Sequence, residues 1–295
     1  MRACRGEESP GKTAHVGRII PAMDFTQPTT LGRTGLQVGR LGIASGYWAP
    51  AEAIELAFER GCNYLTWGTF IRGRSPHVRE AVRRIVANGQ RDRLVLAMFS
   101  YAHQPFLTER FFARGLRDLG IERADVLVLG YFSQPPGRAI IDGALRMKEK
   151  GLVRFIGLSG HNRKVFGALR REGVIDVFHV RYSAVHPGAE QDAFPAIGGA
   201  GRPGVVAFTA AAWGKLLDPR KMPPGEAPPR PADCYRFALS HPAVDVCMVG
   251  AKSVSQMRDD LETLDRGPLD ATEMARMRRI GDHIYGKPRP ATAAV

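Results

Sequence analysis

Short runs of apolar residues recur along the chain, and most are followed by a segment whose apolar side chains recur at helical spacing. The runs predict eight strands, at residues 40–45, 63–67, 94–100, 125–130, 153–159, 176–182, 204–209 and 244–249. The segments after them predict helices at residues 51–60, 75–86, 108–119, 137–150, 164–171, 232–240 and 255–264, with a weaker pattern near 190–197. A last amphipathic helix is expected at residues 271–284.

This alternation of strands and helices decides between two kinds of α/β fold. Continuous apolar runs indicate strands buried on both faces, as in a parallel sheet. Eight strand–helix units are the number that closes a (β/α)8 TIM barrel, which typically needs about 250 residues in one domain. An open, doubly wound sheet would carry a GxGxxG loop after its first strand, and residues 39–42 lack that pattern. We therefore predict a barrel.

The two ends of the chain add three features to this barrel. Gly35 lies between short apolar flanks and predicts a hairpin at residues 31–38, at the N-terminal end of the barrel. Residues 1–25 carry mixed charges without periodicity or a signal-peptide core, so we expect a disordered tail before a barrel domain at 26–295. Met23 is a candidate start residue. The helix at 271–284 is an extra C-terminal element.

The composition indicates which classes of ligand and partner this domain can be expected to bind. The net charge is +13, but arginines such as Arg83 and Arg170 are spread over the predicted helices, so we expect a solvated basic surface and no nucleic-acid site. The charge still favours acidic ligands, including a phosphate-rich cofactor. No apolar run approaches the roughly 20 residues that span a bilayer. The four cysteines show no paired spacing, so we expect a reducing, cytoplasmic compartment and no disulfide or metal site.

Four stretches, in order, resemble signatures of the aldo-keto reductases. Residues 151–162 read GLVRFIGLSGHN, which is similar to GKVRxIGxSN. Residues 31–38 resemble LGxTGLxVS, residues 116–127 resemble SLxRLxxDYVDLY, and residues 249–256 resemble the IPGxxxxEQxxEN segment. The resemblance covers residues 31 to about 264. It implies a barrel that transfers hydride from NADPH to a carbonyl, with a Tyr donating the proton, a Lys–Asp pair lowering the pKa of that Tyr, and a His orienting the substrate.

The same resemblance implies that this catalytic tetrad is substituted. The Asp, Tyr, Lys and His positions of the family fall on Thr66, Ile71, Phe99 and Gly130. No Lys occurs between Lys12 and Lys148, so a small error in the alignment would not restore the set. An unassisted phenol with a pKa near 10 is a poor acid at neutral pH, so we expect slow or absent reduction of standard aldehydes.

The cofactor positions of the family are better kept. The resemblance implies that Ser159 holds the nicotinamide carboxamide, that Phe208 stacks on the ring, and that Lys252 and Arg258 hold the 2′-phosphate of NADP(H). The full set of expected cofactor residues is Ser159, His179, Phe208, Thr209, Gly214, Lys215, Leu216, Lys252, Ser253, Gln256 and Arg258. Asp260 replaces the Asn that would meet the adenine.

Polar residues at the predicted strand ends offer a substitute for the missing acid. Barrel enzymes place their chemistry at the carboxyl ends of the strands, and our candidates there are His161 and Tyr182. The first hypothesis is an NADP(H)-dependent oxidoreductase acting on a small carbonyl or alcohol. The second is a catalytically inactive barrel that senses NADP(H) or another phosphorylated ligand, or serves as a partner subunit. A lyase or isomerase using His161 and His179 is a third. The Pro-rich segment 222–231 is either a rigid surface loop or a flap over the ligand.

Overall fold

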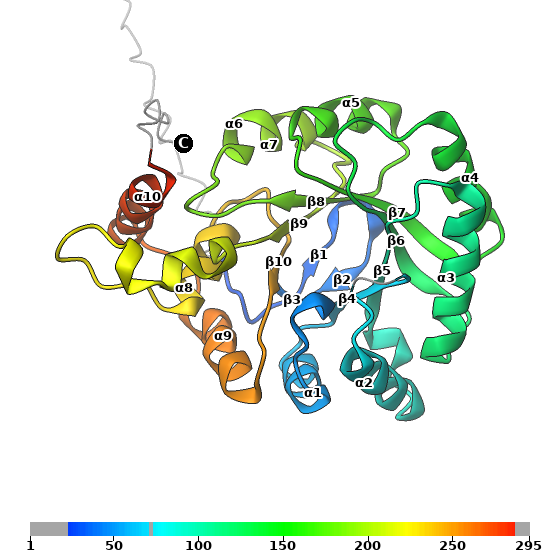
Figure 1. Ribbon diagram of the computed structural model, residues 1–295, viewed down its shortest axis with the longest axis horizontal. Coiled ribbons are helices and arrows are strands. Elements are labelled where there is room, and N and C mark those ends of the chain that lie inside the picture. Colours follow the sequence, from blue (N-terminus) through cyan, green and yellow to red (C-terminus); the bar gives the residue numbers. More distant parts are fainter. Residues whose placement is uncertain (1–22, 71–72, 287–295) are drawn as a thin grey trace, which may run out of the picture.

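The computed structural model describes residues 23–70 and 73–286, and its centre is a closed barrel of eight parallel strands (Figure 1). The strands are β3 (Leu41–Ile43), β4 (Tyr64–Gly68), β5 (Val95–Ser100), β6 (Ala124–Leu129), β7 (Val153–Gly160), β8 (Val177–Arg181), β9 (Gly204–Phe208) and β10 (Val246–Val249). Each strand pairs with the next one in the sequence, and β10 also pairs with β3, which closes the ring. The predicted (β/α)8 barrel is confirmed, and each predicted strand overlaps an observed one.

Helices surround the barrel (Figure 1). They are α1 (Ala51–Glu59), α2 (Pro76–Ala87), α3 (Pro105–Leu119), α4 (Arg138–Glu149), α5 (Lys164–Glu172), α6 (Ala189–Asp192), α7 (Phe194–Ile197), α8 (Pro231–Leu239), α9 (Val254–Arg266) and α10 (Ala271–Tyr285). The weak pattern near residues 190–197 is two short helices that meet at Ala193. Helix α3 begins three residues before its predicted start, because Pro105 suits the first turn of a helix.

A hairpin closes the N-terminal end of the barrel, as predicted. Strands β1 (Thr29–Thr30) and β2 (Gln37–Val38) pair antiparallel, and Gly35 turns the chain between them with a φ of 72°. A Cβ on Gly32 would lie 2.2 Å from the backbone nitrogen of Gly204, so only glycine lets the hairpin approach β9 this closely. Leu31, Leu36 and Val38 of this segment pack against the apolar interior of the barrel. Of the predicted tail at residues 1–25, residues 1–22 lie outside the described residues, whereas Phe25 is buried in the core.

The N-terminal rim of the barrel carries a repeated hydrogen bond. At the start of every second strand, one side chain accepts a hydrogen bond from a backbone N–H of the preceding strand or of the residues just before that strand. The four pairs are Asn63 with Gly39 at 3.0 Å, Asp125 with Leu96 at 2.9 Å, Asp176 with Ile156 at 3.1 Å and Asp245 with Val205 at 2.9 Å. Arginine or lysine side chains pair with each of the three aspartates. These bonds tie neighbouring strands together at the end opposite to that of most barrel active sites.

The C-terminal helix and the Pro-rich loop are fixed to each other. Gly281 of α10 lies so close to the chain that a Cβ would be 2.1 Å from the carbonyl oxygen of Ala184. Glu226, inside the Pro-rich segment, pairs with Arg276 and Arg279 of α10. This loop is therefore held on α10. Within the described residues, no helix is both long enough and apolar enough to cross a membrane.

Candidate active site at the carboxyl ends of the strands

A cavity of about 1010 Å³ opens at the carboxyl ends of the barrel strands. Its walls come from the ends of the strands, from the loops after β3 and β9, and from α9. A volume of this size is at the upper end of the range for small-molecule sites. Among the described residues that line it, the charged ones are Lys252, Asp259 and Asp260, which lie on one side, Lys252 after β10 and the two aspartates on α9. The remainder of the wall is neutral and rich in aromatic rings.

Thr66, Phe99 and Gly130, the described residues at positions where the resemblance expects the tetrad, carry no acid–base group. The Thr66 hydroxyl accepts a hydrogen bond from the Ser45 backbone N–H at 3.1 Å and donates to the Ile43 carbonyl at 3.3 Å. Its hydroxyl is therefore used to join the ends of β3 and β4. Phe99 packs its ring edge to face with the imidazole of His179, with centroids 5.1 Å apart. Ile71 lies outside the described residues.

Tyr101 occupies the space that a side chain at position 130 would need. A Cβ built on Gly130 would lie 2.6 Å from the Tyr101 ring, so a histidine there would displace the tyrosine. The Tyr101 ring also contacts Tyr131, with centroids 5.1 Å apart, and both residues line the cavity. The absence of a side chain on Gly130 therefore leaves room for the Tyr101 ring, one residue beyond β5. Neither tyrosine was among the site residues predicted from the sequence.

His161 lies where the sequence predicts it, on the wall of the cavity just after β7. Its ring is 5.8 Å from that of Phe208 and 6.3 Å from that of Tyr131, measured between centroids. Desolvation by the surrounding protein, and then the nearby Arg181 guanidinium, lower the pKa of His161 below its usual value of 6.5. The imidazole is therefore neutral at pH 7 and suited to accept a proton rather than to donate one.

Tyr182, the other candidate acid, is not in the cavity. Its ring is buried among Phe194, Phe237 and His241, and its hydroxyl donates to Glu190 at 2.6 Å. Burial, and then the Glu190 carboxylate, raise the pKa of Tyr182 well above its usual value of 10. The physical reason for the misplacement is strand alternation: His179 faces the barrel interior, and a residue three positions later faces the helices. We therefore withdraw Tyr182 as a proton donor.

The expected cofactor residues divide into two groups. Ser159, His179, Phe208, Thr209, Gly214, Lys252 and Gln256 line the cavity together. Lys215, Leu216, Ser253 and Arg258 do not line it. Leu216 is fully buried in the core, and the Ser253 hydroxyl caps α9 by accepting the Gln256 backbone N–H at 3.1 Å. Lys215 is exposed outside the cavity.

Helix α9 explains why Arg258 is absent from this wall. Gln256, Asp259 and Asp260 line the cavity, and their spacing of three and four residues places them on one face of the helix. Arg258, two positions after Gln256, lies on the opposite side and is exposed. Helical periodicity applied to Gln256 would have identified Asp259, whereas motif spacing alone selected Arg258.

Asp260 is the most perturbed carboxyl group of the site. Its side chain is buried, with 4% of the residue exposed, beside Tyr235 of α8. Burial raises the pKa of Asp260 to about 7, while a hydrogen bond with Tyr235 lowers it and the Asp259 charge raises it. Both charge states are therefore populated near neutral pH. The sequence did not predict Tyr235 as a site residue.

Two exposed tryptophans border the cavity. Trp48 follows β3 and Trp213 follows β9, with 60% and 57% of their surfaces exposed. Both adopt left-handed backbone conformations, with φ values of 63° and 56°. A bulky side chain in this region is strained, and such strain often occurs at ligand sites. Strands β3 and β9 flank β10, so the two rings border the side of the cavity that carries Lys252.

Comparison with solved structures identifies proteins of the same fold. An aldo-keto reductase of Bacillus halodurans in its holo form superposes with a TM-score of 0.71 at 18% identity, over 86% of this chain and 96% of that chain. An aldo/keto reductase of Klebsiella pneumoniae in complex with NADP and acetate gives a TM-score of 0.70 at 18% identity, over 90% and 98%. No family model matches the chain, and no curated protein matches it either. The chain therefore has the aldo-keto reductase fold.

Proposed function

We propose that the protein is an aldo-keto-reductase-like oxidoreductase that binds NADP(H) and acts on a small carbonyl or alcohol through an atypical site. The observation that carries the proposal is the gathering of Ser159, His179, Phe208, Lys252 and Gln256 in one cavity. The similar Klebsiella pneumoniae structure holds NADP, which supports the same class of ligand here.

The lining residues fit the two ends of such a cofactor. The Phe208 ring offers a flat apolar face for a nicotinamide, and the Ser159 hydroxyl and the His179 imidazole can hydrogen-bond a carboxamide. Lys252 is exposed beside the N-terminus of α9 and can meet a phosphate there. Because Arg258 faces away and Asp259 and Asp260 face inward, a preference for NADP(H) over NAD(H) depends on Lys252.

His161 is the residue that we propose for proton transfer. When bound, the cofactor supplies the hydride chemistry, and the protein must supply a group that moves the proton. Among the described cavity residues, His161 is an exposed imidazole whose lowered pKa leaves it neutral at pH 7. A neutral imidazole is ready to accept the hydroxyl proton of an alcohol. The proposal therefore favours oxidation of an alcohol over reduction of an aldehyde.

Binding is tested by fluorescence titration of NADPH and NADH against wild type and Lys252→Ala. We expect NADPH to bind more tightly than NADH and Lys252→Ala to weaken NADPH binding about 5- to 10-fold, as for the loss of one charged contact. NADH binding should change little. Lys221→Ala, which removes an exposed Lys outside the cavity, is the matched control. An equal loss for both cofactors would contradict the role of Lys252, and no binding of either would contradict the proposed cofactor.

Turnover is tested with NADP⁺ and a panel of alcohols, by following absorbance of the reduced nicotinamide. We expect oxidation to fall about 10²-fold or more in His161→Ala, the size of a lost acid–base group. His283→Ala removes an exposed histidine on α10 and should leave the rate unchanged. Activity that is equal in both variants would exclude His161.

A second candidate function is a barrel that binds NADP(H) without turnover, as a sensor or partner subunit. It is favoured because, among the described residues that line the cavity, Thr66 and Phe99 are uncharged and the charged side chains are those of Lys252, Asp259 and Asp260. The two candidates differ in one result. Tight NADPH binding with no oxidation or reduction across both panels would support the sensor and contradict the enzyme.

A further inference from the structure

One hydrogen bond runs across the inside of the barrel, beneath the cavity. The Tyr64 hydroxyl, at the start of β4, lies 2.8 Å from Nε2 of His179 on β8. In the ring of eight strands, β4 and β8 are four places apart, so the two residues come from opposite walls. Tyr64 is fully buried and His179 is 2% exposed. The surrounding cluster is apolar and includes Val126, Val206 and Val246.

The burial of Tyr64 decides which atom donates this bond. In an apolar interior the hydroxyl proton needs an acceptor, and an unsatisfied donor costs about 1–3 kcal/mol. Within the described residues, His179 Nε2 is the one hydrogen-bond partner found for this hydroxyl. If Nε2 carried a proton, the hydroxyl proton would have no acceptor. Tyr64 therefore donates to Nε2, and the single proton of the neutral ring lies on Nδ1.

This tautomer determines whether His179 donates or accepts a hydrogen bond toward the cavity. His179 lines the cavity beside Ser159, with which it is paired in register across β7 and β8. Nε2 is occupied by Tyr64, so hydrogen bonding toward a ligand falls to Nδ1. We propose that Tyr64 is a positioning residue that holds His179 as the Nδ1–H tautomer, so that the cavity floor offers a neutral donor to an amide or carbonyl oxygen. That this oxygen belongs to a nicotinamide carboxamide rests on the proposed function, whereas the tautomer does not.

The same pair cannot be the missing acid. Burial lowers the pKa of His179 to about 3, so the imidazole is not protonated at neutral pH. Burial, and then the Asp125 charge, raise the pKa of the Tyr64 hydroxyl above its usual value of 10. If His179 gave up its Nδ1 proton, it would become an imidazolate. If Tyr64 then gave its own proton to Nε2, a buried phenolate would be left instead. The pair therefore orients a ligand, and proton transfer belongs to another group.

The tautomer is tested by two-bond ¹H–¹⁵N spectra of protein labelled in histidine, without ligand. The His179 signal, assigned by its loss in His179→Gln, should show the Nδ1–H pattern and should not titrate between pH 8 and pH 5. Tyr64→Phe removes only the hydroxyl and should convert this signal to the averaged pattern of two exchanging tautomers. An Nε2–H pattern in the wild type would overturn the proposal even if Tyr64→Phe failed to fold, and so would an unchanged tautomer in a folded Tyr64→Phe protein.

The ligand contact is tested by titrating NADPH into Tyr64→Phe. We expect affinity to fall about 3- to 10-fold, as for one misdirected neutral hydrogen bond. Tyr285→Phe is the matched control, because Tyr285 lies at the end of α10 and does not line the cavity, so this variant should bind NADPH within about 2-fold of wild type. Equal affinity in wild type and Tyr64→Phe, with the tautomer changed, would overturn the contact. If wild type binds no NADPH while His179 shows the Nδ1–H pattern, the proposed cofactor fails and the tautomer stands.

Discussion

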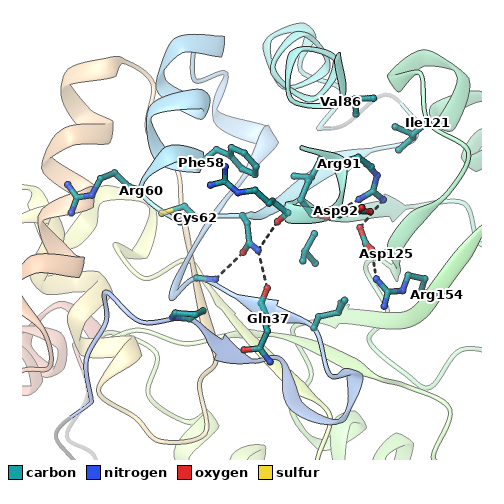
Figure 2. Close-up of a pocket in the computed structure, with 18 of the residues that line it drawn as sticks. Gln37, Phe58, Arg60, Cys62, Val86, Arg91, Asp92, Ile121, Asp125 and Arg154 are labelled. Carbon is teal, nitrogen blue, oxygen red and sulfur yellow. Dashed lines mark hydrogen bonds and ion pairs between the residues drawn. The ribbon is translucent and has the colours of Figure 1, made fainter. Parts of the chain in front are cut away.

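The two ends of this barrel each carry a large depression, and they differ in how their polar groups are used. The groove at the N-terminal rim measures about 960 Å³, close to the 1010 Å³ of the cavity at the carboxyl ends. Figure 2 shows that Arg91 and Arg154 in the groove both turn toward Asp125. The cavity, by contrast, is lined by neutral rings and by charges confined to the β10–α9 side.

The two ends of the barrel also differ in backbone strain. The described non-glycine residues with positive φ are Trp48, Tyr131, Thr209, Ala212 and Trp213. All five follow β3, β6 or β9, at the carboxyl ends of the strands. Strain of this kind persists only where the surrounding structure enforces it, and it gathers at binding sites. Cavity volume therefore does not distinguish the two ends of the barrel, whereas backbone strain does.

The largest change in stability is expected when a side chain that forms the hydrogen bonds of the N-terminal rim is removed. Asp245 accepts the Val205 backbone N–H and both terminal nitrogens of Arg202. Asp245→Ala should lower the free energy of unfolding by about 3–4 kcal/mol, since a buried N–H and a guanidinium lose their acceptor. Urea denaturation measures this, and NADPH affinity should be unchanged at temperatures where the variant is folded.

The control for this rim experiment is Asp192→Ala, which removes an exposed partner of Arg163. Its loss should stay below about 1 kcal/mol. A similar, small loss in Asp245→Ala would mean that the rim does not stabilise the barrel.

The free energy of unfolding should depend on pH through His179, which lies beneath the cavity. The folded pKa of His179 is about 3, and the unfolded value is near 6.5, so its contribution to stability is full above pH 6.5 and is lost as the pH falls toward 3. At pH 4.5 this amounts to about 3 kcal/mol. Urea denaturation at pH 7.5 and 4.5 should therefore show a steeper loss in wild type than in His179→Gln. Equal losses would contradict a buried neutral ring, and comparison with His283→Gln corrects for exposed histidines.

The contribution of Asp260 to stability should change with pH in the opposite direction to that of His179. Its folded pKa of about 7 lies above the unfolded value of 3.8, so stability is lost as the pH rises through this interval and stays low above pH 7. Asp260→Asn should therefore stabilise the protein by about 2–4 kcal/mol at pH 8 and by almost nothing at pH 4. Thermal unfolding at both pH values measures the difference. Asp259→Asn, at an exposed neighbour, should give less than half this gain, and a gain that is independent of pH would refute the buried carboxyl.

The smallest effect on stability is expected at the mouth of the cavity. Trp213 is mostly exposed, so Trp213→Ala should change the free energy of unfolding by less than about 0.5 kcal/mol. It should nevertheless weaken NADPH binding several-fold, because the ring borders the cavity. A Trp213→Ala protein that loses stability without losing affinity would contradict this account. Trp67→Phe, in the buried core, is the contrasting control and should lose stability while keeping its affinity for NADPH.

Much of the fold could be predicted because each element has a local signal. Continuous apolar runs gave the strands, and Gly35 gave the hairpin turn. The rim bonds of Asn63 and Asp245 could not be predicted, because their partners are backbone groups brought close only by barrel closure. Strand alternation from His179 would have excluded Tyr182, and helical periodicity from Gln256 would have excluded Arg258. The Tyr64–His179 bond joins opposite walls, and no local pattern reports such a contact.

The central claim, that ligand binding belongs to the carboxyl end of the barrel, is tested most directly by amide hydrogen exchange with and without NADPH. A bound ligand slows exchange where it restricts opening of the chain. We expect slower exchange in residues 208–217 and 250–260, which border the cavity, and no change in residues 91–94 and 120–125 of the N-terminal groove. Protection confined to the groove, or no protection at either end, would contradict the account.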